Sequence, residues 1–204
     1  MEIEAELSVI IEHAEAIERQ LPVIIEAERK RLEEELTGAD YDERYGMMQW
    51  IDEFADEVLP RLYRSPILVE LWAVFESTII EIGKYLKQQA GHSLSVDDLR
   101  GSNDFERAQK YYAHVLHFPL IEIADMKEQL EMLLLVRNAI AHSNARLEVI
   151  KPARLEKIYH WEKVRGGITT SANYLNFSAE FVEDMAKAVK TSVEDLIRRV
   201  KAKH

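Results

Sequence analysis

Apolar residues recur in steps of four and three along the first 36 residues, a spacing that places them on one face of a long helix. The positions that share this face are Ile3, Leu7, Ile10, Ala14, Ile17, Leu21 and Ile24. A stripe this regular suits either a coiled-coil dimer or a helix that packs on its own bundle, and the second interpretation is favoured. Pro22 lies inside the pattern, so we expect the helix to kink or split there. The pattern ends at a break over residues 37–40.

The next part of the chain contains two helical patterns with proline signals between them. The first helix is expected over residues 41–58, with Pro60 ending it. The second is expected to begin with Ser65 as the N-cap and Pro66 at the first helical position. Its residues are apolar on most sides through Leu86, which predicts a helix at the centre of the fold.

The middle of the chain is expected to hold a loop and two further helices. The loop covers residues 91–103 and contains one turn at Val96–Leu99. The helices are expected over residues 104–116 and 121–142. The second helix carries a nearly uninterrupted apolar run over residues 130–136, so we expect it to have neighbours on several sides.

Extended segments are predicted only toward the end of the chain. Residues 147–150 are expected to form a short strand and residues 152–164 a helix. Residues 168–176 are expected to form an extended segment or a small hairpin. Ser178 is expected to cap a last amphipathic helix that ends near Val200.

These patterns predict an all-α fold, an up-and-down helical bundle with a small extended or hairpin segment near the C-terminal end. Seven glycines and five prolines in 204 residues leave little material for the many turns of an all-β protein. A single domain is expected over residues 1–204. Its parts are a helical extension over residues 1–64, a core over residues 65–150 that carries the candidate site, and a final helix, hairpin and helix over residues 151–204.

Composition narrows the classes of function. The chain has no cysteine, which excludes disulfides, thiolate metal sites and a cysteine nucleophile. Its first residues lack a signal-peptide pattern and no apolar run reaches the ~18 residues of a membrane span, so we expect a cytoplasmic protein that does not enter a membrane. The net charge of −11 argues against broad binding to long nucleic acids. Residues 137–165 nevertheless contain seven lysines and arginines against three glutamates, which predicts a basic patch on an acidic body.

Arg137 and Asn138 directly follow the apolar run, and His142 lies one turn beyond Asn138. A charged arginine is rarely placed beside a buried run without a partner. Asn138 and His142 share a helix face at i and i+4, whereas Arg137 points roughly 140° away from His142. Arginine and histidine suit phosphodiester chemistry, because a guanidinium holds phosphate oxygens and an imidazole titrates near neutrality. A two-fold homodimer would bring Arg137 of one copy to His142 of the other, so we expect a site shared by two copies.

The segment Arg137-Asn138-Ala139-Ile140-Ala141-His142 has an arginine, a polar residue directly after it, and a histidine after four intervening residues. This pattern resembles the signature of HEPN-family nucleases. Residues 99–112, which follow the predicted central helix, are similar to the corresponding stretch of stand-alone HEPN proteins from microbial toxin and defence systems. The resemblance covers residues 65–150.

The resemblance implies an endoribonuclease that needs neither metal nor cofactor and acts in a toxin, abortive-infection or phage-defence system. The ribose 2′-OH would be the nucleophile and a cyclic phosphate the product. His142 is implied as general base or acid, Arg137 as the group that stabilises charge on the phosphate, and Asn138 as an orienting group. The implied partners are RNA, a second copy of the chain and a cognate antitoxin or other defence protein. The residues expected to bind the RNA substrate are Arg146, Lys151 and Asn144.

Two positions after the motif differ from the toxins that pair with nucleotidyltransferase antitoxins. Those toxins usually carry a tyrosine two residues after the histidine, where this chain has Asn144, a difference that counts against that kind of pairing. Ala145 stands where related sequences often have glycine, a difference that concerns only how the helix ends.

The same residues also fit simpler roles. Basic side chains interact favourably with a helix C-terminus, so Arg137 and His142 can serve only to end the helix. A catalytically inactive HEPN-like module that binds a protein partner or a nucleotide is then the alternative. An antitoxin or immunity-type protein with an acidic surface is a third interpretation.

Other chemistry-bearing residues are better explained by packing. His114 and His117 lie one helical turn apart, but their aromatic neighbours favour packing over metal binding, and no Glu-x-x-His pair exists in the sequence to complete a di-iron site. The tryptophans, expected in the core or at an interface, are Trp50, Trp72 and Trp161.

Overall fold

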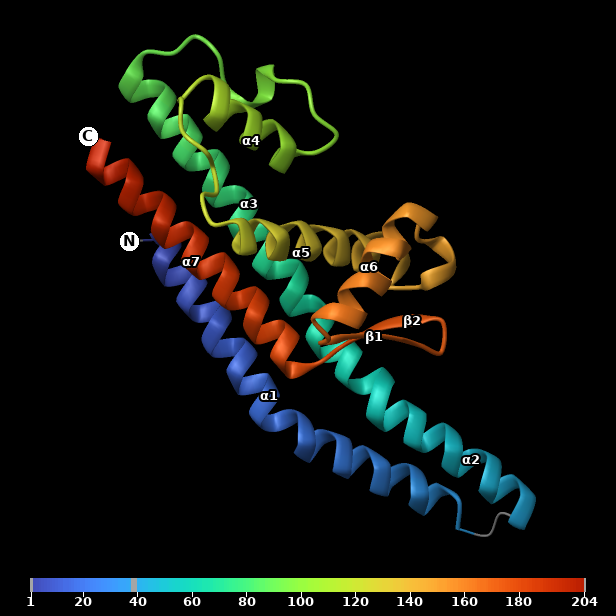
Figure 1. Cartoon of the computed structure of the whole chain (residues 1–204). Coiled ribbons are helices and arrows are strands. Elements are labelled where there is room, and N and C mark those ends of the chain that lie inside the picture. Colours follow the sequence, from blue (N-terminus) through green and yellow to red (C-terminus); the bar gives the residue numbers. More distant parts are fainter. Residues whose placement is uncertain (1, 38–39, 204) are drawn as a thin grey trace.

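The computed structural model describes residues 2–37 and 40–203, and helices account for most of them (Figure 1). In chain order the helices are α1 (Glu2–Glu35), α2 (Tyr41–Glu53), α3 (Leu59–Ala90), α4 (Asp104–His114), α5 (Ala124–Ser143), α6 (Pro152–Val164) and α7 (Ala179–Lys203), and the strands are β1 (Ile168–Ser171) and β2 (Tyr174–Phe177). The predicted all-α bundle with a small hairpin is therefore confirmed. No helix among the described residues is long and apolar enough to cross a membrane.

The centre of the bundle is α3, which contacts α1, α4, α5 and α7. Its fully buried side chains include Leu68, Leu71, Trp72 and Ile79. The ring of Phe105 on α4 lies edge-on against those of Trp72 and Phe75, with centroid distances of 5.3 and 5.9 Å. Because apolar side chains surround α3, it needs neighbours on several faces, which confirms the prediction of a central helix.

The apolar stripe of α1 is used inside the bundle. Leu7, Ile10, Ala14 and Leu21 are buried, and α1 packs on α3 and α7. The side chain of Ile3 lies outside the described residues. The helix continues through Pro22 without a break, and Figure 1 shows that it bends between its two halves. Of the two interpretations of the stripe, packing on the chain's own bundle is confirmed.

The two prolines that were expected to separate helices do not interrupt the chain. Residues 41–90 form one continuous helical run, in which a π-helical segment (Phe54–Val58) joins α2 to α3. The expected end at Pro60 and the expected start at Ser65 are therefore wrong. Pro60 lies in the first turn of α3, directly after the π segment, where a missing backbone N–H costs least. Pro66 lies inside α3, where burial of the residues that follow it offsets the lost hydrogen bond.

Several smaller features differ from or agree with the sequence predictions. The break predicted over residues 37–40 includes residues 38–39, which lie outside the described part of the chain. The helix expected over 121–142 begins three residues later, at Ala124. The turn predicted at Val96–Leu99 is a 3-10 turn at Val96–Asp98. The division predicted between residues 64 and 65 falls inside α3, and buried residues from all three predicted parts join one hydrophobic core.

The predicted hairpin forms where expected. Strands β1 and β2 pair antiparallel, with Ile168 opposite Phe177 and Ser171 opposite Tyr174. The Ser178 hydroxyl then accepts a hydrogen bond from the backbone N–H of Phe181 at 3.1 Å, which confirms that Ser178 caps the last helix.

The first turn of α4 contains a titratable capping interaction. The side chain of Asn103 accepts a hydrogen bond from the backbone N–H of Glu106 at 2.8 Å. The Glu106 carboxylate in turn accepts hydrogen bonds from Lys110 at 2.6 Å and from the Ser102 backbone N–H and hydroxyl at 2.8 and 2.7 Å. The hydrogen bond from Lys110, helped by those from Ser102, lowers the pKa of Glu106 to about 2.

The burial of α3 predicts that alanine substitutions at two of its leucines lower the free energy of unfolding by very different amounts. Leu68 has no exposed surface, whereas Leu62 is 48% exposed. We predict that Leu68→Ala lowers the free energy of unfolding by about 2–5 kcal/mol, because the substitution leaves a cavity in the core. The matched control Leu62→Ala makes the same change in helix propensity and should cost less than about 1 kcal/mol. Urea unfolding followed by circular dichroism compares the two, and equal losses would contradict the assigned core.

The Glu106 carboxyl predicts a pH effect at the start of α4. Its pKa is lower in the folded chain than its ordinary value of 4.5, so its contribution to stability is complete above that value and is lost as the pH falls toward 2. An NMR titration of the Glu106 carboxyl carbon should give a midpoint near pH 2. In Lys110→Met the midpoint should rise, and a variant midpoint equal to that of the wild type would argue against the Lys110 contact.

Candidate functional site

The C-terminal half of α5 carries the residues singled out in the sequence. The apolar run before them packs α5 against α3 and α7, with Leu130, Leu133 and Val136 fully buried. Arg137 comes next and is half-buried, while His142, in the last turn of the helix, is exposed. The exposure of the motif side chains therefore increases along α5, from the half-buried Arg137 to the exposed His142.

Asn138 and His142 line a small hollow between α5 and the start of α6. Its volume is about 100 Å³. The residues around it are Leu135, Asn138, Ala139, His142, Ser143, Val149, Ile150, Lys151 and Arg154. An imidazole and an amide thus share a concave surface with two cations, a combination that can bind and polarise a phosphate group.

Arg137 does not line this hollow. Its Nη1 donates a hydrogen bond to the side-chain oxygen of Asn138 at 3.0 Å, and its Nε is buried with no hydrogen-bond partner in the described structure. Within one chain, Arg137 is thus tied to Asn138 beside the hollow instead of facing His142 inside it. A buried guanidinium nitrogen without a partner is costly, so this donor is available to a group that the single chain does not supply.

The three residues expected to bind RNA take different positions. Lys151 lines the hollow together with His142. Asn144 is exposed at the end of α5, where it adopts a left-handed conformation with a φ of 50°. Arg146 does not line the hollow, and its Nε donates a hydrogen bond to the hydroxyl of Tyr174 at 3.2 Å. This hydrogen bond raises the pKa of the Arg146 guanidinium.

Arg154 was not among the residues predicted to bind RNA, yet it lines the hollow. It lies one turn after Lys151, in the first turn of α6. The sequence alone shows that these two basic residues lie at i and i+3 at the start of a helix, and this spacing places them on one face. Their closeness to His142 depends on the packing of α6 beside α5, which the spacing of Lys151 and Arg154 does not encode.

The hairpin holds the chain immediately after the motif. The Ala145 carbonyl accepts a hydrogen bond from the backbone N–H of Leu175, and the N–H of Leu147 donates to the carbonyl of Asn173, both at 2.9 Å. Residues 147–150 were expected to form a strand, but Leu147–Val149 form a 3-10 turn. The hairpin pairs with the chain at a single bridge before this turn, between Arg146 and Tyr174, so no ladder extends through residues 147–150.

A buried arginine supports the hairpin from behind. The Arg61 guanidinium lies over the ring of Tyr174, 3.7 Å from its centroid, and Arg61 is only 6% exposed. Burial lowers the pKa of Arg61. The Glu57 carboxylate accepts hydrogen bonds from Ser171 at 2.8 Å and from Asn176 at 3.3 Å. These contacts fix both strands to the π segment and to the first turns of α3.

A larger groove continues from the hollow along α5 and α6, and Leu135 lines both. Its volume is about 460 Å³. Its charged lining consists of Glu128, Glu131 and Glu156 together with Lys157 and His160, and Arg165 binds Glu128 at 3.0 Å. The groove therefore carries charges of both signs, whereas the hollow that holds His142 is lined by two cations, Lys151 and Arg154.

Of the remaining candidates, Trp161 lines the larger groove, whereas His114, His117, Trp50 and Trp72 line neither the groove nor the hollow. Among the described residues, no three histidine, aspartate or glutamate side chains gather to hold a metal ion, His114 and His117 included. Trp72 and Trp161 are buried, whereas Trp50 is 47% exposed on α2 and stacks on Phe54 with ring centroids 5.2 Å apart.

No protein-family model, no curated protein and no solved structure matches this chain.

The turn of the hairpin predicts a stabilising substitution. Ala172 and Asn173 both have left-handed φ values, 46° and 67°, as two-residue hairpin turns require. Glycine adopts this conformation without the steric penalty that alanine has. We predict that Ala172→Gly raises the free energy of unfolding by about 0.5–1 kcal/mol.

The matched control for Ala172→Gly is Ala141→Gly, at an exposed position inside α5. There the same change should lower the free energy of unfolding by about 0.5–1 kcal/mol, because glycine is a poor helix former. Thermal unfolding measures both variants. A loss of stability in Ala172→Gly would show that the turn does not have this conformation.

Proposed function

We propose that this protein is a metal-independent endoribonuclease of the HEPN type. The observation that carries the proposal is the hollow in which His142 and Asn138 lie together with Lys151 and Arg154, next to the half-buried Arg137. Such a set supplies a proton-transfer group and several phosphate-binding cations at one place. A role in a toxin, abortive-infection or phage-defence system of the cytoplasm follows from the sequence resemblance.

In this proposal the 2′-oxygen of a ribose attacks the adjacent phosphorus while its proton passes to a base. The bond from phosphorus to the 5′-oxygen of the next nucleotide breaks, and that oxygen takes up a proton. The products are a 2′,3′-cyclic phosphate and a free 5′-hydroxyl. His142 moves one of these protons, and Arg137 stabilises the negative charge that develops on the phosphate. DNA lacks the 2′-hydroxyl and would not be cleaved.

Two copies of the chain would complete the site. Within one chain Arg137 is bonded to Asn138 and does not line the hollow of His142. A two-fold axis midway between positions 137 and 142 of α5 would bring Arg137 of each copy toward the hollow of the other.

A second candidate function is a catalytically inactive module that binds a protein or a nucleotide. The Arg137–Asn138 hydrogen bond favours it, because that bond holds both side chains in a purely structural contact. The net charge of −11 also suits a protein partner, such as a cognate antitoxin or another defence protein, better than a long RNA.

The enzyme proposal is tested by incubating the full-length protein with structured and unstructured RNAs in the presence of a chelator. We expect cleavage that leaves cyclic phosphate ends. His142→Ala should reduce the rate by at least about 100-fold, because a proton-transfer group is lost. Arg137→Ala should reduce it to a similar degree. His13→Ala replaces an exposed histidine on α1 and should leave the rate unchanged.

Mixing the two inactive variants tests whether the site is shared. Co-expressed Arg137→Ala and His142→Ala chains form heterodimers in which one site keeps both wild-type side chains. About a quarter of the wild-type rate should return. No recovery in proven heterodimers would show that both groups act within one chain. Cleavage that persists in His142→Ala would contradict the proposed endoribonuclease mechanism and would favour the catalytically inactive binding module.

A further inference from the structure

The larger groove between α5 and α6 begins where the hollow of His142 ends. Leu135 lines both, and from there the groove continues toward the start of α5 and the end of α6. Its volume of about 460 Å³ falls in the ~300–1,000 Å³ range of pockets that hold a small molecule, whereas the hollow of about 100 Å³ falls below it. The hollow therefore suits a phosphate group, and the groove suits a larger part of the same ligand.

The lining of the groove suits a flat aromatic ring. Met132 and Trp161 are buried residues of its lining, only 6% and 5% exposed. His160 lines it from the exposed side of α6, and its imidazole is a surface on which a nucleobase can stack. The indole Nε1 of Trp161 is buried with no hydrogen-bond partner in the described structure, and such an unpaired donor is costly unless a ligand supplies an acceptor.

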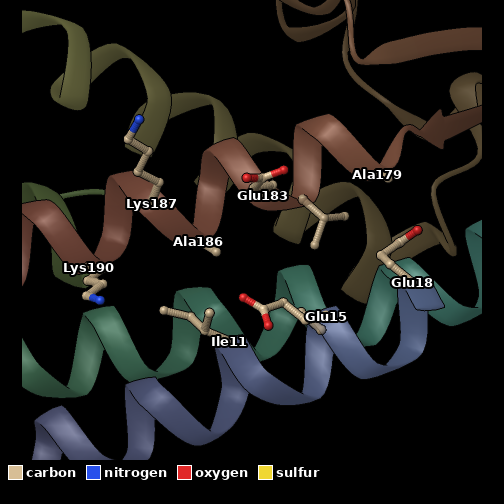
Figure 2. Close-up of a pocket in the computed structure, with 10 residues that line it drawn as sticks. Ile11, Glu15, Glu18, Ala179, Glu183, Ala186, Lys187 and Lys190 are labelled. Carbon is tan, nitrogen blue, oxygen red and sulfur yellow. The ribbon is translucent and has the colours of Figure 1, made fainter.

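A groove of similar size between α1 and α7 lacks these features. Its volume is about 410 Å³. Figure 2 shows that Glu15, Glu183 and Lys187 extend from its two helices, and that Ala186 is among its small side chains. None of the described residues that line it is aromatic, and none lines the hollow of His142. This groove therefore offers a base no ring to stack on and shares no residue with the candidate site.

The polar side chains of the α5–α6 groove differ in whether they already have partners. On α5, Glu128 binds Arg165 at 3.0 Å. Glu131 reaches Lys127 at 4.0 Å. The polar residues that α6 contributes to the groove are Glu156, Lys157 and His160. None of these three makes an ion pair or a hydrogen bond within the described part of the chain, so a carboxylate and an ammonium group on neighbouring residues are available to a ligand.

We propose that this groove binds a guanine base of single-stranded RNA beside the phosphate that the hollow holds. Guanine presents two adjacent N–H donors, on N1 and N2, followed around its edge by two acceptors, O6 and N7. A carboxylate accepts both N–H bonds in parallel, and a lysine donates to O6 or N7. Glu156 and Lys157 both line the groove and supply these two groups.

The other bases match this pair of side chains less well. Uracil has its one ring N–H between two carbonyl oxygens, and these oxygens repel a carboxylate. Adenine and cytosine have an amino group beside a ring nitrogen that is an acceptor, so each donates only one hydrogen bond to Glu156. Loss of a bidentate contact to a base corresponds to at least about a 5-fold difference in preference.

The spacing along α6 agrees with neighbouring parts of one RNA strand. Glu156 and His160 follow Arg154 on the helix by about 3 and 9 Å at ~1.5 Å per residue. The groove extends from Leu135 toward Glu128, away from positions 137 to 142 where a second copy would approach. This inference rests on the proposed function, because the groove is assigned to RNA through its continuity with the hollow of His142.

Base preference at the cleavage sites tests the inference on the full-length protein. RNAs of random sequence are incubated with the wild type in chelator, and the new ends are sequenced. We expect guanine at one of the two positions that flank the cleaved bond, enriched at least about 5-fold. Glu156→Gln should remove most of this enrichment, because an amide has only one acceptor atom. Glu148→Gln makes the same change at an exposed position outside the groove and should keep the preference.

A binding experiment separates this inference from the ribonuclease proposal. The probes are the 5′-monophosphates of guanosine, adenosine, cytidine and uridine, added to the full-length His142→Ala variant. NMR follows the indole N–H of Trp161, which lines the groove. We expect the guanosine nucleotide to bind at least about 5-fold more tightly than the other three, and Glu156→Gln in the same background to remove the difference.

The two experiments give distinct outcomes. Cleavage without a base preference, together with equal binding of the four nucleotides, would overturn the guanine site and leave the ribonuclease proposal in place. Preferred binding of the guanosine nucleotide by a chain that cleaves no RNA would support the guanine site and favour the nucleotide-binding module over the enzyme. A guanine preference that is unchanged in Glu156→Gln would overturn the assignment of the base to this groove.

Discussion

Burial of α3 on most sides is the constraint on which the other elements depend. A helix with apolar residues around most of its circumference cannot lie on a surface by one face alone, so α1, α4, α5 and α7 must cover it and leave only a narrow stripe exposed. Each large apolar side chain that leaves water contributes about 1.5–3 kcal/mol. The several buried side chains that follow Pro66 thus offset the ~3 kcal/mol that a proline costs inside a helix.

The same packing sets the character of the candidate site. α5 is held against α3 and α7 by its apolar run, and the buried stretch ends at the motif. Arg137 is therefore only partly solvated, while His142 reaches water at the end of the helix. The cations that share a hollow with His142 belong to the next helix, whose direction is fixed by the turn after Ala145 and by the hairpin bonded to it.

Periodicity and capping residues were sufficient to predict most elements, because those signals act within a few residues of each other. The helix over residues 152–164, the hairpin and the Ser178 cap are examples. The helical run does not end at Pro60 or start again at Ser65, because tertiary burial outweighs the local proline signals. For the site, spacing placed Asn138 with His142, and the structure places both on the hollow. The presence of Arg154 there and the position of Arg146 on Tyr174 depend on how α6 and the hairpin pack, which no short segment encodes.

The contacts that anchor the hairpin couple unfolding of the candidate site to unfolding of the helical bundle. Two strands of four residues cannot be stable alone in water. These strands are tied to the long helical run through Glu57 and Arg61, and Arg64 donates from the same run to the carbonyl of Phe177. The backbone after His142 is bonded to the hairpin in turn. The backbone after His142, the hairpin and the start of α3 therefore belong to one cooperative unfolding unit. The candidate site should stay ordered until the whole domain unfolds.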